Sequence, residues 1–424
     1  MAFFRTRNHR DDRIVISGFG CLTPLGNDSA ALFDGFRRAR SGIDRIVSFD
    51  PSEFPVQIAG EVRGLDPFQV FPYKERVHVS RTAALAVLAA REAIADAKLD
   101  PKALETEQRR RIGVVIGSGG GGLEFTERQY AHWYRGEPKK ASVYTIPTST
   151  IGSLSSEISL MFGLRGPSHV VSTGCTSSTD AIFYACENII TGRADIVVTG
   201  GADAPLAPGI LAGFCLMRVL TESWNGDPAC GSRPFSADRD GFVLGEGAWV
   251  YVVERESSAR ERRAPIYAEI LGYGSTCDAY HRVRLDDSGE ESARAMELAM
   301  QDAGVMPCDV DYVNLHGTST PLNDRIETRA VKRCFGEAAA RIPMSATKSM
   351  IGHPQGASGA AGISAVIFAM REGLIPPTLN LKDPDPDCDL DYVPLEPRAS
   401  RVRVAVANCI GFGSKNSALV LGAA

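Results

Sequence analysis

The apolar positions along the chain alternate between short β-branched runs and longer segments rich in alanine and leucine. The short runs predict buried strands, and the longer segments predict helices. The predicted strands cover residues 13–17, 111–117, 195–200, 266–272, 312–315, 401–407 and 417–421, and a long helix is predicted over residues 77–97. Strands that alternate with helices indicate an α/β protein whose sheets are covered by helices.

This alternation runs through the chain twice. The first pass reaches about residue 254, and a charged stretch over residues 255–263 looks like the link to the second pass. Each pass contains a segment of small residues that enters an apolar helix, at residues 172–190 and 348–370. We therefore predict a structural duplication. Its parts are a flexible leader over residues 1–12, an N-terminal half over 13–258 and a C-terminal half over 259–424.

Composition narrows the class of protein. A chain of 424 residues exceeds the usual size of a single hydrophobic core. Its net charge of -5 gives no support to nucleic-acid binding, and no apolar run is long enough to span a membrane. The polar start of the chain lacks the apolar core of a secretory signal. Ten cysteines without a Cys-x-x-Cys pair suit a reducing cytoplasm and argue against a zinc site.

One cysteine has a setting suited to catalysis. Cys175 follows Gly174 at the point where an extended segment enters a predicted helix. The positive end of a helix dipole favours the thiolate, which is the nucleophilic form of cysteine. The alternative is a buried structural thiol, and residues 171–190 alone do not decide between the two.

Three further segments carry residues suited to acid–base or oxyanion chemistry. His316 ends a predicted strand and precedes a polar loop, and Lys348 and His353 precede a run of glycine and alanine. The glycines of the turn at residues 411–413 permit backbone angles that can aim an N–H group at an oxyanion. Each segment also has a structural alternative: a capping histidine, a tight helix contact and an ordinary glycine turn.

Two patterns suggest ligand sites but lack the required context. Residues 117–122 (GSGGGG) satisfy G-x-G-x-x-G after a strand, but no clear second strand ending in an acid follows. The alternating aspartates of residues 383–391 (DPDPDCDLD) suggest calcium, but the required glycine and closing glutamate are missing. We interpret residues 383–391 as a turn-rich surface loop.

Six motifs, in order along nearly the whole chain, resemble the β-ketoacyl synthase family. They are GLRGPS (163–168), STGCTSS (172–178), SRPFSADRDGFVLGEGA (232–248), HGTSTPLND (316–324), TKSMIGH (347–353) and GFG (411–413). The resemblance implies the thiolase fold, a duplicated five-layer αβαβα arrangement. It also implies that no metal or redox cofactor is needed, because the substrates are carried on the phosphopantetheine of an acyl carrier protein.

The resemblance further implies a role for each matching residue. Cys175 would accept an acyl chain as a thioester. His316 and His353 would assist decarboxylation of a malonyl group and stabilise the enolate and the oxyanion. Lys348 would order the site, and Glu327 would be the acid paired with it.

Other matching residues would shape the site and bind the substrate arm. Phe412 would gate the site, and its N–H group and that of Cys175 would form the oxyanion hole. Thr318 and Thr320 would contact the phosphopantetheine arm. Gly120 stands where fatty-acid enzymes often have a bulkier apolar residue, which predicts a deeper acyl pocket that admits long, stiff or unsaturated chains.

Two kinds of protein partner follow from the resemblance. The acyl carrier protein is acidic, so a basic docking rim is expected, and Lys74, Arg76 and Arg81 are its candidates. Family members also pair across their sheets, so a homodimer or a heterodimer with a chain-length-factor-like ketosynthase is expected.

Four alternatives stay open for the activity. STGCTSS and DPDCDLDYVP resemble most the catalytic ketosynthase of type II polyketide systems, with a polyene or aromatic product, and an elongating fatty-acid enzyme is the second alternative. A thiolase is the third, because residues 352–359 look thiolase-like and Cys409 lies where thiolases keep a second catalytic cysteine. The motif at His316 favours the ketosynthase, in which Cys409 would be a spectator. A non-catalytic chain-length-factor-like subunit would lack the nucleophile that Cys175 supplies.

Overall fold

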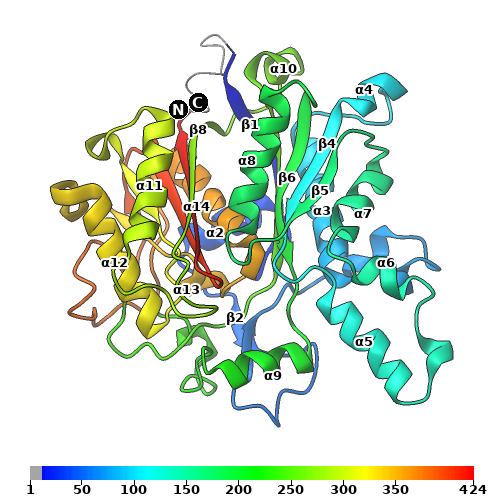
Figure 1. Cartoon of the computed structure of the whole chain (residues 1–424), viewed down its shortest axis with the longest axis horizontal. Coiled ribbons are helices and arrows are strands. Elements are labelled where there is room, and N and C mark those ends of the chain that lie inside the picture. Colours follow the sequence, from blue (N-terminus) through cyan, green and yellow to red (C-terminus); the bar gives the residue numbers. More distant parts are fainter. Residues whose placement is uncertain (1–11) are drawn as a thin grey trace.

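The computed structural model describes residues 12–424, and most of their strands form one ten-stranded sheet with helices on both sides (Figure 1). Two small sheets are separate, one of β2 (Ile43–Arg45) with β3 (Ile58–Gly60) and one of β11 (Leu374–Ile375) with β12 (Arg398–Ala399). The strands that the first half contributes to the large sheet are β1 (Ile14–Leu22), β4 (Ile112–Gly117), β5 (Ser168–Val171), β6 (Ile196–Asp203) and β7 (Gly247–Arg255). Those of the second half are β8 (Ala268–Cys277), β9 (Tyr312–Asn314), β10 (Met344–Ser345), β13 (Val404–Gly411) and β14 (Lys415–Gly422).

The strand order shows the duplication directly. Counted outward from the middle of the sheet, the first half runs β1-β7-β6-β4-β5 and the second runs β8-β14-β13-β9-β10. In both halves the inner pairings are antiparallel and the outer pairings are parallel. The halves join where β1 pairs antiparallel with β8, at Val15 with Glu269 and Ile16 with Ala268.

The helices complete the five layers expected of the thiolase fold. Helices α3 (Arg81–Asp96) and α7 (Ser153–Phe162) cover the first half of the sheet, and α11 (Glu290–Ala303) and α12 (Pro321–Phe335) cover the second (Figure 1). Helices α8 (Ser177–Ile190) and α14 (Ser358–Glu372) lie between the two halves. Each interface has its own cluster of buried apolar side chains, so the layers are held together chiefly by hydrophobic burial.

The two halves also share an unusually close approach of a helix to the first strand. A Cβ atom on Gly20 of β1 would lie 2.2 Å from the carbonyl oxygen of Ala89 in α3. A Cβ atom on Gly274 of β8 would lie 2.1 Å from the carbonyl oxygen of Ala295 in α11. Only glycine fits at either position, so the repeated glycines of these strands are required by packing.

The α/β alternation and the central helices are confirmed, with different boundaries. The long helix begins at Arg81, because the hydroxyl of Ser80 caps it by accepting a hydrogen bond from the N–H group of Ala83 at 3.1 Å. The charged link is itself a short helix, α10 (Glu256–Glu261). The predicted halves and their boundary at residue 258 stay a prediction, and residue 258 lies inside α10.

The predicted leader lies outside the described residues, except for Asp12. That residue is tied to α10, because its carboxylate accepts hydrogen bonds from the N–H group and the hydroxyl of Ser257 at 3.0 and 2.9 Å. None of the helices found between residues 12 and 424 is long and apolar enough to cross a bilayer.

Candidate active site

The site forms where the first turns of α8 and α14 touch. A Cβ atom on Gly359 would lie 2.0 Å from the hydroxyl oxygen of Thr179, so no side chain fits there. The N–H group of Ala360 donates to the hydroxyl of Ser178 at 2.9 Å. Because this contact sets the two helix starts side by side, the loops that precede them also meet.

Those loops bring together the predicted nucleophile and one predicted histidine. The sulfur of Cys175 lies 3.3 Å from Nε2 of His353, and Nδ1 of His353 lies 3.0 Å from the hydroxyl of Ser358. Both catalytic candidates are buried and line a cavity of about 310 Å³. A thiol, a base and a group that orients the base are the parts needed for nucleophilic catalysis.

The second predicted histidine completes the cluster. The ring of His316 meets the ring of His353 edge to face, with centroids 5.3 Å apart, and it lines the same cavity. Its Nδ1 lies 3.6 Å from the sulfur of Cys409. The site therefore presents one thiol and two imidazoles to a bound substrate.

Glu327 and Lys348 hold His316 by its main chain. The carboxylate of Glu327 accepts hydrogen bonds from the N–H groups of His316 and Gly317, both at 2.7 Å. The ammonium of Lys348 donates to the carbonyl of His316 at 2.6 Å. The predicted pairing of Glu327 with Lys348 is therefore indirect, since no direct ion pair joins them among the described residues. The amide of Asn408 adds a third bond to Glu327, at 2.7 Å.

Two main-chain N–H groups converge on the sulfur of Cys175. Hydrogen bonds from the N–H groups of Phe412 and of Cys175 itself both favour its anionic form. Gly174, with a φ of +72°, provides the left-handed turn before the cysteine. A Cβ atom on Gly174 would also press on the carbonyl of Phe412 at 3.3 Å. The oxyanion hole expected from these two N–H groups stays a prediction.

Burial dominates the electrostatics of the site. It raises the pKa of the Cys175 thiol to about 11, although the Phe412 N–H group and the charge of Lys348 act in the opposite direction. The expected preference for thiolate is thus wrong for the resting protein, because Cys175 lies before the N-cap Thr176 and is almost completely buried. Burial and nearby Lys348 lower the pKa of both His316 and His353 well below the ordinary value, so both imidazoles are neutral.

The predicted substrate threonines line the cavity, whereas Gly120 does not. The hydroxyls of Thr318 and Thr320 lie 3.1 Å apart at the start of α12. The N–H group of Gly120 donates to buried Asp203 at 3.0 Å, and Gly120 is not part of the cavity that holds Cys175. The deeper acyl pocket expected from Gly120 stays a prediction.

Asp203 is a residue that the sequence interpretation missed. Its carboxylate accepts hydrogen bonds from the hydroxyl of Ser118 and from the N–H groups of Gly119, Gly120 and Gly356. It therefore ties the glycine run of the first half to the loop that carries His353. The signal available in the sequence was an acid three residues after the predicted strand 195–200.

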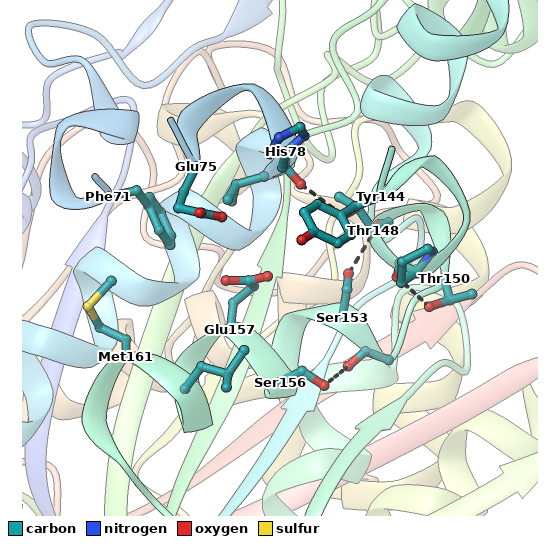
Figure 2. A pocket seen from close by; sticks show the side chains of 14 residues that line it. Phe71, Glu75, His78, Tyr144, Thr148, Thr150, Ser153, Ser156, Glu157 and Met161 are labelled. Atoms are coloured by element: carbon teal, nitrogen blue, oxygen red, sulfur yellow. Dashed lines mark hydrogen bonds between the residues drawn. The ribbon is translucent and has the colours of Figure 1, made fainter. Parts of the chain in front are cut away.

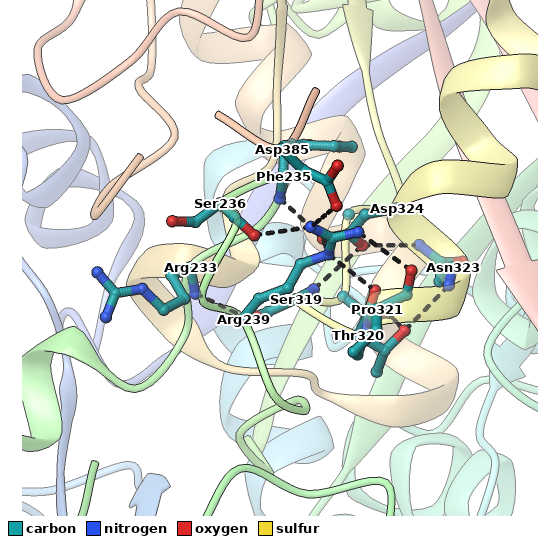
Figure 3. A network of polar contacts seen from close by, with 12 residues as sticks. Arg233, Phe235, Ser236, Arg239, Ser319, Thr320, Pro321, Asn323, Asp324 and Asp385 are labelled. Atoms are coloured by element: carbon teal, nitrogen blue, oxygen red, sulfur yellow. Dashed lines mark hydrogen bonds and ion pairs between the residues drawn. The ribbon is translucent and has the colours of Figure 1, made fainter. Parts of the chain in front are cut away.

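A buried ion network fixes the loop that carries the threonines (Figure 3). The guanidinium of Arg239 donates to the carbonyl groups of Thr320 and Pro321, both at 3.1 Å, and to the carboxylate of Asp385 at 2.7 Å. It also lies 3.4 Å from the buried carboxylate of Asp324. The loop over residues 383–391 is thus more than a surface turn, because its Asp385 is part of this network.

The thiol of Cys175 and the imidazoles of His316 and His353 also have a spacing compatible with a soft metal ion. Ligand atoms of Cys175, His316 and His353 all lie within 4.8 Å of one another. The catalytic interpretation already accounts for their convergence, and the expectation that no metal is required stays a prediction.

The raised pKa of Cys175 predicts the pH dependence of its alkylation. We expect the rate with iodoacetamide to rise about tenfold per pH unit from about pH 7 to about pH 9, because the thiolate fraction grows in that proportion below the pKa. Mass spectrometry of the peptide that contains Cys175 measures this rate. Free cysteine is the control and levels off near its ordinary pKa of about 8.5. A plateau for Cys175 below about pH 8 would contradict the prediction.

Comparisons with known proteins agree with this geometry. The family description "Beta-ketoacyl synthase, N-terminal domain" matches residues 11–259, and "Beta-ketoacyl synthase, C-terminal domain" matches residues 267–382. The chain is 40% identical to 3-oxoacyl-[acyl-carrier-protein] synthase 2 of Coxiella burnetii (strain RSA 493 / Nine Mile phase I) over 409 residues, which cover 96% of this chain and 98% of that protein.

Two solved structures are also similar over 97% of this chain and 99% of theirs. One is the ketosynthase of the complex AntDE:AntF, a type II polyketide ketosynthase with its acyl-carrier protein, with a TM-score of 0.88 and 30% identity. The other is the ishigamide ketosynthase/chain length factor, with a TM-score of 0.87 and 33% identity. With the fold and the buried Cys–His–His cluster, these similarities show that the chain belongs to the β-ketoacyl synthase family and is an elongating ketosynthase, an acyltransferase that forms carbon–carbon bonds.

Proposed function

We propose that Cys175 carries an acyl chain while that chain is extended by decarboxylative condensation with malonyl-acyl-carrier protein. The observation that carries the proposal is the sulfur of Cys175 at 3.3 Å from Nε2 of neutral His353, with the ring of His316 edge to face against the ring of His353. This arrangement supplies a nucleophile, an acceptor for its proton and a second imidazole for the incoming substrate.

In the first step, the sulfur of Cys175 attacks the thioester of the acyl carrier. Because burial keeps the thiol protonated, its proton moves to Nε2 of His353 as the new carbon–sulfur bond forms. The N–H groups of Phe412 and Cys175 face the oxyanion of the tetrahedral intermediate. The old carbon–sulfur bond then breaks, and the carrier thiol leaves with the proton held by His353.

In the second step, the bond between the α-carbon and the carboxylate of the malonyl group breaks. Carbon dioxide leaves, and the electron pair of that bond stays on the malonyl remnant as an enolate. Two neutral imidazoles, His316 and His353, can donate hydrogen bonds to the enolate oxygen. The enolate carbon attacks the thioester on Cys175, the bond from carbon to the cysteine sulfur breaks, and a β-ketoacyl chain two carbons longer leaves on the carrier. A proton from solvent restores the thiol of Cys175.

For the pathway, we propose a type II polyketide system. The motifs STGCTSS and DPDCDLDYVP support it, as does the similarity to the type II PKS ketosynthase of the AntDE:AntF complex and to the ishigamide ketosynthase/chain length factor. An elongating fatty-acid enzyme is the second candidate, which the 40% identity to 3-oxoacyl-[acyl-carrier-protein] synthase 2 favours. A cytoplasmic location stays a prediction.

Replacing the nucleophile tests the proposed chemistry. We expect Cys175→Ala to abolish chain extension, because no acyl-enzyme forms, whereas Cys186→Ala, a buried thiol elsewhere in α8, extends at close to the wild-type rate. Mass spectrometry of carrier-bound products measures both. Equal extension by wild type and Cys175→Ala would contradict the role of Cys175. Efficient repeated extension of short saturated chains by the protein alone would favour the fatty-acid pathway over the polyketide pathway.

The docking rim for the acidic carrier needs a correction. The guanidinium of Arg81 donates a hydrogen bond to the buried carboxylate of Glu246 at 2.8 Å. Arg81 therefore belongs to a structural ion pair and is not a docking residue. Lys74 and Arg76 stay candidates. Glu75, which lies between them in the chain, and Glu157 point into a different cavity of about 810 Å³ (Figure 2). That cavity shares no lining residue with the one around Cys175.

Two exposed arginines do line the cavity around Cys175. They are Arg218 at the end of α9 (Pro208–Met217) and Arg284 in the loop after β8. We propose that these guanidinium groups attract the acidic carrier and the phosphate of its arm, since opposite charges at an entrance speed association.

Charge reversal tests this rim. We expect Arg218→Glu with Arg284→Glu to raise the KM for malonyl-carrier about tenfold, with a weaker dependence on salt, because attraction becomes repulsion. Turnover of a malonyl thioester without carrier should change little. Arg294→Glu on the outer helix α11 is the matched control. A KM that stays unchanged in the double variant would exclude this rim.

We also propose assembly of two chains through the outer edge of the first half. Strand β5 is the last strand of the sheet, so one of its edges is unpaired within residues 12–424. Nearby α5 (Leu123–Tyr134), α7 and the segment before α6 (Thr145–Ser149) expose large apolar side chains, among them Tyr134 (84%), Leu160 (77%) and Val143 (81%). An open strand edge next to an apolar face is typical of a protein interface.

Charges on this face test the assembly. We expect the wild-type chain to be a dimer and Val143→Asp with Leu160→Asp to be a monomer, because the buried carboxylates would lose their hydration. Light scattering gives the molar mass. Met306→Asp, which places a charge on an exposed apolar residue of the second half, is the control. A wild-type monomer that dimerises only with a chain-length-factor-like protein would support the heterodimer.

A further inference from the structure

The geometry points to Cys409 as a positioning residue that sets the tautomer of His316 during decarboxylation. This inference rests on the proposed function of His316 and adds a role for a residue that the ketosynthase interpretation treats as a spectator. It is independent of which acyl chain the enzyme carries.

The thiol of Cys409 bridges the two parts of the site. It lies on β13, is buried, and donates to the carbonyl of Cys175 at 3.1 Å. The same sulfur lies 3.6 Å from Nδ1 of His316, within the limit for a hydrogen bond to sulfur. One atom therefore contacts the main chain of the nucleophile and the side chain of the histidine.

The thiol of Cys409 has one proton and two possible acceptors, the carbonyl of Cys175 and Nδ1 of His316. Burial raises the pKa of Cys409 far above its ordinary value, so the thiol stays protonated. When the S–H bond points to Nδ1 of His316, the neutral ring must carry its proton on Nε2. When it points to the carbonyl of Cys175, the sulfur accepts from Nδ1, and Nε2 becomes an acceptor. In the structure the S–H bond points to the carbonyl of Cys175 at 3.1 Å, which is the second state. Only the first state donates a hydrogen bond from Nε2 to an enolate oxygen, so decarboxylation requires the thiol to turn to Nδ1 of His316.

The other histidine has an equivalent partner. Nδ1 of His353 faces the hydroxyl of Ser358 at 3.0 Å, so each imidazole has a small donor–acceptor group on the side away from the reacting atoms. A hydroxyl and a thiol have the same donor and acceptor capacity. Serine should therefore replace Cys409 in this role, whereas alanine should not.

Cys409 does not take part in the bond-forming steps themselves. It is absent from the lining of the cavity around Cys175, so a substrate there reaches His316 and not the second thiol. This separates the inference from thiolase chemistry, in which a second cysteine would have to touch the substrate. The effect of Cys409 must pass through His316.

The experiment measures the two half-reactions separately. We expect Cys409→Ala to slow decarboxylation of malonyl-acyl-carrier protein roughly tenfold, the effect of losing one positioning hydrogen bond. Acylation of Cys175 by an acyl carrier should stay within about twofold of the wild-type rate, and Cys409→Ser should restore decarboxylation to within about threefold. In protein labelled with 15N-histidine, the ring-nitrogen signals of His316, assigned by their loss in His316→Gln, should shift between tautomer states in Cys409→Ala and return in Cys409→Ser.

Controls separate this role from a packing defect and from failure of the proposed function. Cys186→Ala removes another buried thiol and should leave both half-reactions unchanged. Wild-type decarboxylation in Cys409→Ala, or equal loss of both half-reactions in Cys409→Ala and Cys409→Ser, would overturn the inference. If the wild-type protein failed to decarboxylate malonyl-carrier at all, the proposed function would fail, whereas the His316 signals would still report whether Cys409 sets the tautomer.

Discussion

The contact between the first turns of α8 and α14 is the constraint on which the rest of the site depends. Gly359 leaves just enough room for Thr179, and the loops before the two helices therefore meet. Cys175 comes from the first of these loops and His353 from the second. A side chain at Gly359 would separate the helices, and the distance between sulfur and imidazole would grow with them.

Burial then determines what each group at this contact can do. Burial favours uncharged forms, so the two imidazoles are neutral and the thiol of Cys175 keeps its proton. The carboxylate of Glu327 tolerates the same surroundings because main-chain N–H groups of His316 and Gly317 solvate it. The charged groups of Glu327 and Lys348 thus bind the main chain of the loop at His316, whereas the neutral side chains of Cys175, His316 and His353 line the cavity.

The sequence predicted the fold well, because strand periodicity is local. The motifs around Cys175 and His316 named residues that the structure brings together. The supporting residues could not be predicted in this way. Asp203 and Asp385 act on partners distant in the sequence, which only the fold brings near. The predicted thiolate form of Cys175 was wrong for the same reason. The start of a helix can be predicted from the sequence, whereas the burial that outweighs the helix dipole is a property of the whole fold.

The repeated strand order has a consequence for how such a site can arise. Neither half contains both a nucleophile and its proton acceptor, since the sulfur comes from one half and both imidazoles come from the other. A single ancestral half, paired with an identical copy, would have set two equivalent helix starts against each other. Gene duplication and fusion would have freed each start to specialise, one for holding the acyl chain and the other for proton transfer.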